Sequence, residues 1–166
     1  LVGHSRGGHL ISWLALEHPE LTKTLVIVDS ATLAPESPVF PSMRFYDNLP
    51  VHFGPPTTES VRIEPDAQAI RREHVTDQFV ERLLQIAKLP NFQEAKESME
   101  KFGAKVWTPS VSRKRQEVMG RIEQAGLPVP TLMVWGLNDR SAPLPLGLQL
   151  FERIAAKTPH SELHML

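Results

Sequence analysis

The chain has 166 residues, with 18 basic and 19 acidic side chains and no cysteine. A net charge of −1 gives no electrostatic footprint for nucleic acid or an anionic membrane surface, so we expect a small-molecule partner. The lack of cysteine excludes disulfides, thiolate nucleophiles and cysteine-based zinc sites, and it favours the cytoplasm as the compartment. No apolar run approaches the roughly 20 residues that cross a bilayer.

Both ends of the sequence suggest a chain cut inside a fold. It begins Leu-Val-Gly-His rather than with Met, and it ends on the alternating run 162–166, which is typical of a strand. The length allows one compact domain but is short for a complete enzyme of the class that the motifs indicate. We therefore expect a fragment of one domain.

The first elements predict a βαβ unit. Leu1-Val2 is typical of the end of a buried strand, and 7–18 has the apolar spacing of a helix that stops before Pro19. The β-branched run 24–28 predicts a parallel strand that is buried on both faces.

The sequence then leaves the sheet. Residues 34–65 are rich in proline, which disfavours both helices and central strands. Amphipathic sequence follows and is broken by Pro90, Gly103 and Pro109. This pattern indicates a helical cap, whose predicted helices cover 66–87, 91–102 and 110–124.

Sheet character returns after the cap. Residues 129–135 predict a strand, 144–156 a helix, and the last residues another strand. The expected fold class is α/β, with a partial sheet of mostly parallel strands flanked by helices. The predicted domains are a core segment over 1–33, a helical cap over 34–127 and a second core segment over 128–166.

A Gly-x-Ser-x-Gly motif surrounds Ser5. A serine becomes a nucleophile if a base reaches its hydroxyl and its oxyanion is stabilised, and a sharp strand-to-helix turn provides the geometry for both. Such a turn strains the serine, so small residues are expected at Gly3 and Gly7, and Gly8 lets the helix approach the sheet. The backbone N–H of Arg6, at the helix start, is the predicted half of an oxyanion hole.

The predicted catalytic acid is Asp139. It follows the strand 129–135, and in folds built around such a serine turn the triad runs serine, acid, histidine along the chain. A loop-capping aspartate is the alternative interpretation. Asp29, after the strand before the cap, is a competing acid, less favoured because the return through the cap places Asp139 beside the final strand.

None of the seven histidines fits the catalytic base well. His4 flanks the nucleophile and should pack beside the turn, while His164 alternates within the last predicted strand, where a strand position is favoured over a catalytic role. We expect the base to follow Leu166, so that residues 1–166 alone are inactive. The other histidines are His9 and His18 on the first helix, His52 and His74 in the cap region, and His160 before the last strand.

Three segments carry a family resemblance: Leu-Val-Gly-His-Ser-Arg-Gly-Gly, then Leu-Ala-Leu-Glu-His-Pro-Glu-Leu, and later Val-Trp-Gly-Leu-Asn-Asp-Arg-Ser-Ala-Pro. They resemble the α/β-hydrolase superfamily, and most nearly the meta-cleavage product hydrolases. Those enzymes split a carbon–carbon bond in vinylogous 1,5-diketones formed when aromatic rings are opened. The resemblance implies Ser5 as the nucleophile or the group that activates water, Asp139 as the acid and Arg6 as an oxyanion donor, with no cofactor or metal.

Two departures from that family are visible. These hydrolases usually have a small or thioether residue at the position of Arg6, and their substrate-binding cap arginine corresponds here only to Arg82, one position out of register. A solvated helix face is the alternative interpretation of Arg82. Serine at position 5, where dehalogenases and epoxide hydrolases carry aspartate, argues against both of those activities.

The expected function is hydrolysis of a ketone-activated carbon–carbon bond in aromatic catabolism. A homo-oligomer is compatible with this function. An ordinary carboxylesterase, lactonase or aminopeptidase-like hydrolase is the alternative within the superfamily. A basic, polar pocket favours the first, and an apolar pocket favours the second. A non-catalytic binding protein of the same fold is the alternative from another class, because a fold does not establish an activity.

Overall fold

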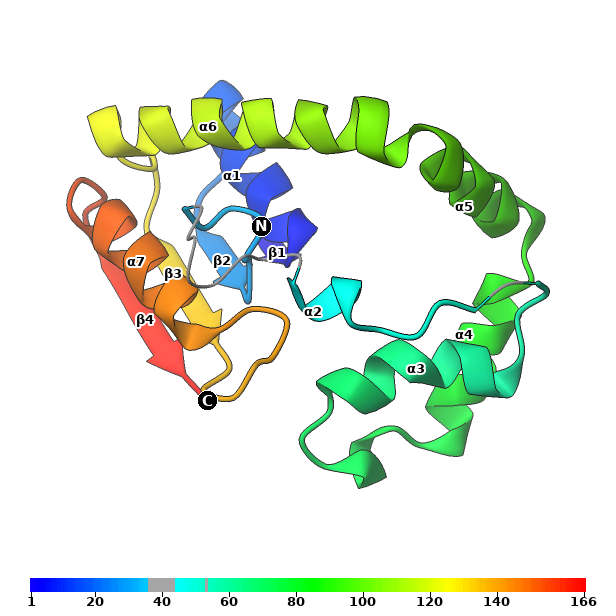
Figure 1. Ribbon diagram of the computed structural model, residues 1–166. Coiled ribbons are helices and arrows are strands. Elements are labelled where there is room, and N and C mark those ends of the chain that lie inside the picture. The colour runs from blue at the N-terminus through cyan, green and yellow to red at the C-terminus, as the bar shows by residue number, and fades with distance from the viewer. Residues whose placement is uncertain (36–43, 53) are drawn as a thin grey trace. The chain divides into compact units, whose positions relative to one another are not determined.

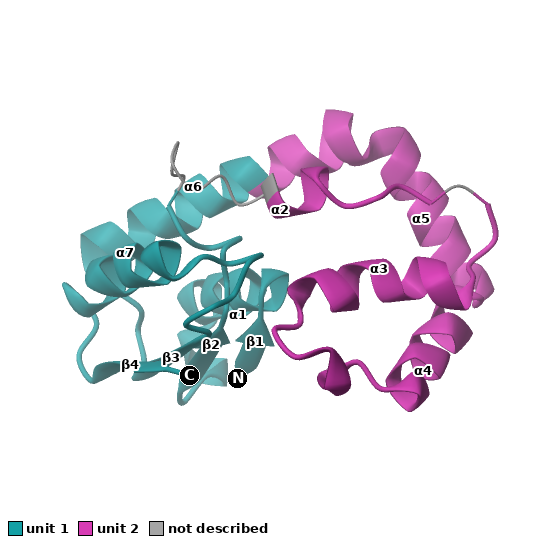
Figure 2. Cartoon of the chain, turned by 60° about the horizontal axis from the view of Figure 1, so that its bottom comes forward, with its two compact units in different colours: residues 1–44, 112–166 teal, residues 45–111 magenta. Residues whose placement is uncertain are grey.

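The computed structural model describes residues 1–35, 44–52 and 54–166. It divides into two compact units, which Figure 2 colours teal and magenta. Unit 1 comprises residues 1–44 and 112–166, and unit 2 comprises residues 45–111. Unit 2 lies inside the predicted cap segment 34–127, and its role as a cap stays a prediction.

Unit 1 is built on a parallel sheet of four strands in the order β1-β2-β3-β4 (Figure 1). This confirms the predicted α/β class. Since the strands are parallel, the residues that follow them gather at one edge of the sheet, where ligands of α/β folds bind. The strands are β1 (Val2–His4), β2 (Leu25–Val28), β3 (Thr131–Trp135) and β4 (Ser161–Met165).

One face of this sheet carries the hydrophobic core. Ile27 and its register partner Met133 are fully buried there, together with Ile122 of the last helix before β3. Val26 and Val28, which point to the other face, are only half-buried, so burial of β2 on both faces was a wrong expectation. Three helices contribute residues of unit 1 to this core: α1 (Arg6–Glu17), α6 (Thr108–Ala125) and α7 (Leu144–Ala155).

Polar contacts fasten α1 to α6. Arg121 bonds both the Glu17 carboxylate and the Leu16 carbonyl, and the Lys114 ammonium lies 4.6 Å from the centroid of the Trp13 ring. These ion-pair, hydrogen-bond and cation–π contacts hold α1 against α6.

Unit 2 is helical, and its helix boundaries differ from those predicted. The predicted helix 66–87 is two helices, Thr58–Gln68 and Asp77–Ala87, with a 3₁₀ turn between them. A capping box at Thr57 starts the first one at Thr58, before the predicted start. Pro65 lies inside that helix, close to its end, where the loss of one N–H is tolerated. The elements not given above are η1 (Pro19–Leu21) of unit 1, α2 (Arg44–Asp47), α3 (Thr58–Gln68), η2 (Arg72–His74), α4 (Asp77–Ala87), α5 (Pro90–Phe102) and the π-helical η3 (Gly103–Trp107).

In the part of the chain that the structure describes, no helix is both long and apolar enough to cross a membrane.

Candidate active site

Ser5 occupies a strained turn between β1 and α1. Its φ of 51° and ψ of −118° place a residue with a side chain in the left-handed half of conformational space, at a cost of about 1–3 kcal/mol. The turn is held because the Ser5 N–H donates to the Val28 carbonyl at 2.9 Å and the Gly8 N–H donates to the Ser5 carbonyl at 3.0 Å. Backbone strain of this kind is typical of a nucleophile elbow.

The three glycines of this turn have different steric roles. A Cβ on Gly3 would lie 2.4 Å from the Gly7 carbonyl oxygen, and a Cβ on Gly8 would lie 2.6 Å from Ser30 Cβ. A Cβ on Gly7 would meet nothing within 4 Å. The expected steric need for glycine is therefore confirmed at two positions and wrong at Gly7, which faces open space.

Ser30 is a further part of the turn that sequence reasoning missed. Its side chain is fully buried, and its Oγ donates to the Ser5 carbonyl at 2.6 Å. It comes directly after Asp29 at the end of β2, on the strand beside β1. Small polar residues after a buried strand were the available signal, but the sequence does not show which neighbour they bind.

Arg6 is the first residue of α1. Its N–H therefore belongs to the N-terminal turn, where backbone donors and the helix dipole favour negative charge. Its role as an oxyanion donor stays a prediction.

Asp139 lies in the loop after β3, as predicted. Its Oδ1 accepts hydrogen bonds from the Ser141 N–H at 2.7 Å, the Ser141 hydroxyl at 2.8 Å and the Ala142 N–H at 2.8 Å. The buried Trp135 donates its indole N–H to the Ala142 carbonyl at 2.7 Å, which ties the same loop to β3. All three donors bind Oδ1, and the other oxygen of a carboxylate can accept an imidazole N–H.

Asp29, the competing acid, lies at the same edge of the sheet. Its φ is 41°, and its Oδ1 accepts the N–H of Gly136, the residue that follows the neighbouring strand β3, at 2.8 Å. Burial raises the pKa of the Asp29 carboxyl, the nearby charge of Asp139 raises it further, and the Gly136 hydrogen bond and His4 act in the opposite direction. The structure thus brings both candidate acids together.

The histidines of unit 1 have other surroundings. His9 is buried, and desolvation is the main cause that lowers its pKa, while its Nε2 finds no hydrogen-bond partner among the described residues. His164 lies in β4 and its Nε2 is 3.1 Å from Glu162, while His18 pairs with Glu20. His160 precedes β4, at the sheet edge opposite the one that Ser5 follows. None of these four is arranged as a base for Ser5.

Arg82 lies on α4 in unit 2, where it is exposed. Its proposed contact with a substrate carboxylate stays a prediction.

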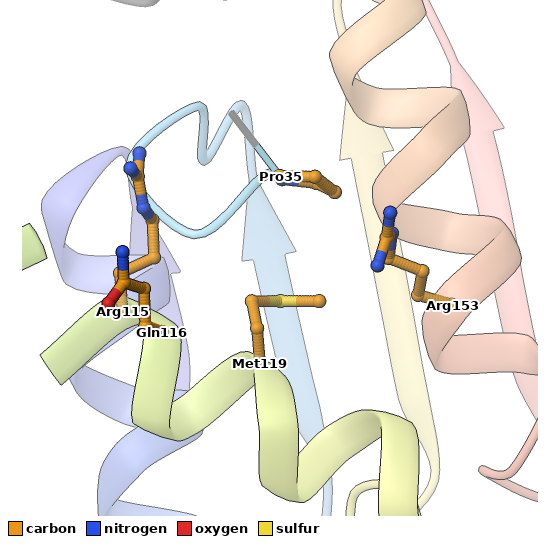
Figure 3. A pocket seen from close by; sticks show the side chains of 5 residues that line it. All are labelled: Pro35, Arg115, Gln116, Met119 and Arg153. Atoms are coloured by element: carbon orange, nitrogen blue, oxygen red, sulfur yellow. The ribbon is translucent and has the colours of Figure 1, made fainter. Parts of the chain in front are cut away.

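A surface pocket of about 150 Å³ lies in unit 1, outside these candidate residues (Figure 3). The figure shows Arg115 and Met119 on α6 and Arg153 on α7. Neither Ser5 nor Asp139 lines it. Across residues 1–35, 44–52 and 54–166, no group of three or more His, Cys, Asp or Glu side chains gathers as metal ligands.

Known proteins resemble the whole chain. It is 28% identical over 173 aligned positions to a 2-hydroxy-6-oxononadienedioate/2-hydroxy-6-oxononatrienedioate hydrolase of Escherichia coli K12. The alignment covers 99% of this chain and 53% of that protein, so the chain spans about half the length of the curated relatives that it matches.

Solved structures show the same fold. A meta-cleavage product hydrolase from Pseudomonas fluorescens IP01 superposes with a TM-score of 0.70 at 24% identity, over 99% of this chain and 54% of that one. A 2-hydroxy-6-oxo-6-phenylhexa-2,4-dienoate hydrolase from Rhodococcus sp. strain RHA1 gives 0.66 at 22% identity, with the same coverage. The relatives are thus meta-cleavage product hydrolases, the group that the sequence motifs indicated. The family model for the alpha/beta hydrolase fold matches residues 1–166, and the chain therefore belongs to the α/β-hydrolase fold family.

Proposed function

We propose that the whole protein is a serine hydrolase that cleaves a carbon–carbon bond in a ring-cleavage product of aromatic degradation. The observation that carries the proposal is the strained Ser5 turn, set one strand away from Asp29 and two from the Asp139 loop. The activities of the relatives in E. coli and Rhodococcus supply the substrate class.

In the proposed reaction, the Ser5 hydroxyl is the nucleophile or activates a water molecule at the substrate ketone. Asp139 orients the base through the oxygen that its own loop leaves available, and the charge of Asp139 stabilises the imidazolium. The N–H of Arg6 stabilises the oxyanion that forms on the ketone oxygen when the ketone carbon is attacked. Water is consumed: one product leaves as a carboxylic acid, and the carbon of the other product takes a proton.

We infer that the base itself lies outside residues 1–166. The histidines of unit 1 other than His4 are buried, paired with carboxylates or at the opposite sheet edge, and His4 is the exposed last residue of β1. A serine without its base loses roughly three or more orders of magnitude of catalysis in well-studied triads.

Arg82 is the proposed partner of the substrate carboxylate. A guanidinium binds a carboxylate through two parallel N–H bonds, and the exposed position of Arg82 on α4 leaves its charge accessible. Lys88, an exposed cation just after the same helix, is a matched control.

The test compares two substrates of the whole protein: a 2-hydroxy-6-oxo-dienoate, followed by the loss of its dienol absorbance, and a neutral p-nitrophenyl ester. We expect faster turnover of the dienoate, and we expect Arg82→Gln to raise its KM about 10-fold or more, since a charged hydrogen bond is lost. The KM for the ester, and both KM values in Lys88→Gln, should stay as in the wild type. Turnover of the ester alone would make the protein an ordinary esterase, and an unaltered dienoate KM in Arg82→Gln would remove Arg82 from the site.

A further inference from the structure

Two consecutive side chains after β2 reach the strands on either side of it. The Ser30 hydroxyl donates to the Ser5 carbonyl, which follows β1, at 2.6 Å. The Asp29 carboxylate accepts the N–H of Gly136, which follows β3, at 2.8 Å. Because β2 lies between β1 and β3 in the sheet, one dipeptide holds the nucleophile turn and the acid loop at once.

We propose that Asp29 and Ser30 are a positioning pair that fixes the spacing between the Ser5 nucleophile and the Asp139 acid. The inference rests on the proposed function for the roles of Ser5 and Asp139, and it deepens that function by naming what sets their distance. Neither residue of the pair needs to touch substrate.

The backbone of Asp29 supports this role. Its φ of 41° is a strained conformation for a residue with a side chain. Two backbone bonds maintain it: the Asp29 N–H donates to the Val134 carbonyl at 3.1 Å, and the Ala31 N–H donates to the Asp29 carbonyl at 3.1 Å. Strain that the surrounding bonds maintain at the edge of a site indicates a conformation kept for its geometry.

The surroundings of Ser30 support it from the other side. The side chain is fully buried, so water cannot replace its bond to Ser5. The absence of a side chain on Gly8 makes room for it, since a Cβ there would lie 2.6 Å from Ser30 Cβ and 2.7 Å from its Oγ. Gly8→Ala should therefore break the Ser30 contact from the helix side.

Replacing Asp29 by asparagine distinguishes the effect of its hydrogen bond from the effect of its charge. The side-chain oxygen of asparagine can accept the same N–H, and asparagine tolerates a left-handed φ better than alanine does. Asp29→Asn should thus keep the positioning, whereas Asp29→Ala removes the acceptor and adds strain. If the charge of Asp29 were what matters, both variants would be equally impaired.

The experiment measures the rate constant with which a fluorophosphonate labels Ser5 in the whole protein, with kcat and KM on a p-nitrophenyl ester. We expect Ser30→Ala, Gly8→Ala and Asp29→Ala each to slow labelling and lower kcat about 5- to 10-fold with little change in KM, as expected for one lost hydrogen bond. Asp29→Asn should stay within about 2-fold of the wild type. Ser12→Ala is the control, because Ser12 is a buried serine whose hydroxyl donates within α1 to the Gly8 carbonyl at 2.8 Å.

A second readout follows the geometry without any reaction. The NMR shift of the Gly136 amide proton should titrate with the carboxyl of Asp29, above the ordinary pKa of aspartate, with Asp139 and His4 as the charged neighbours. The titration should vanish in Asp29→Asn. A Gly136 amide that does not titrate overturns the pairing.

The outcomes separate the two proposals. If the probe labels the wild type, and labels Ser30→Ala and Asp29→Ala as fast as the wild type, only the positioning pair is overturned. Equal losses in Ser12→Ala and Ser30→Ala assign the effect to general destabilisation and overturn it as well. A wild type that the probe does not label at all overturns the proposed function together with the pair.

Discussion

Replacing Gly3 by alanine should be far more damaging than replacing Gly7, although the motif treats the two glycines alike. A Cβ on Gly3 would lie 2.4 Å from the Gly7 oxygen and 2.7 Å from the Gly8 nitrogen, about 1 Å short of ordinary van der Waals contact. Both atoms belong to the backbone of the turn, so no side chain can rotate away. Overpacking commonly costs about 1–3 kcal/mol, and we expect Gly3→Ala to lie at or above the upper end.

Gly7→Ala is the matched comparison. Its Cβ meets nothing within 4 Å, and in a helix alanine is favoured over glycine by up to about 1 kcal/mol, so the free energy of unfolding should stay the same or rise. Urea unfolding of the whole protein, monitored by tryptophan fluorescence, gives the free energy of unfolding of both variants and of the wild type, with one m-value used for all three. A loss below about 1 kcal/mol in Gly3→Ala, or equal losses in the two variants, would refute the steric reasoning.

Three further predictions concern stability and activity. Burial lowers the pKa of His9, so the unfolded chain binds a proton at this histidine more readily, and the free energy of unfolding should fall as the pH drops below the ordinary histidine value of 6.5. Between pH 8 and pH 5 the free energy of unfolding should fall less in His9→Gln than in the wild type, and an equal fall contradicts this. Trp135→Phe leaves the Ala142 carbonyl without its indole donor and should lower the free energy of unfolding in urea by about 1–3 kcal/mol; an unchanged midpoint would show that this bond does not hold the Asp139 loop. Residues 1–166 expressed alone should hydrolyse neither ester nor dienoate at rates comparable to a protein of the relatives' length. Comparable turnover would place the base inside this sequence.

The order of elements in unit 1 could be predicted because each carries a strong local signal. The β-branched run before Asp29 and the apolar spacing before Pro19 indicate a strand and a helix, and both occur with small differences at their ends. The strand-to-helix setting of Ser5 follows from these two signals. The position of Asp139 after β3 follows in the same way.

Other features depend on contacts between distant residues, which a local pattern does not contain. The need for glycine at Gly3 but not Gly7 is set by which side of the turn faces backbone. Ser30 binds Ser5 over 25 residues, and Asp29 binds Gly136 over 107 residues. The start of α3 was missed for a different reason: its capping box lies in a proline-rich segment whose composition disfavours helices.

The most direct test of Ser5 as the nucleophile is the site at which a fluorophosphonate becomes attached. The whole protein is incubated with the probe and digested, and the modified peptide is sequenced by mass spectrometry. We predict one adduct, on Ser5, because its strained turn exposes the hydroxyl beside the first N–H of α1. No adduct should form in Ser5→Ala. An adduct on a different residue, or none in a preparation that turns over substrate, would contradict the assignment.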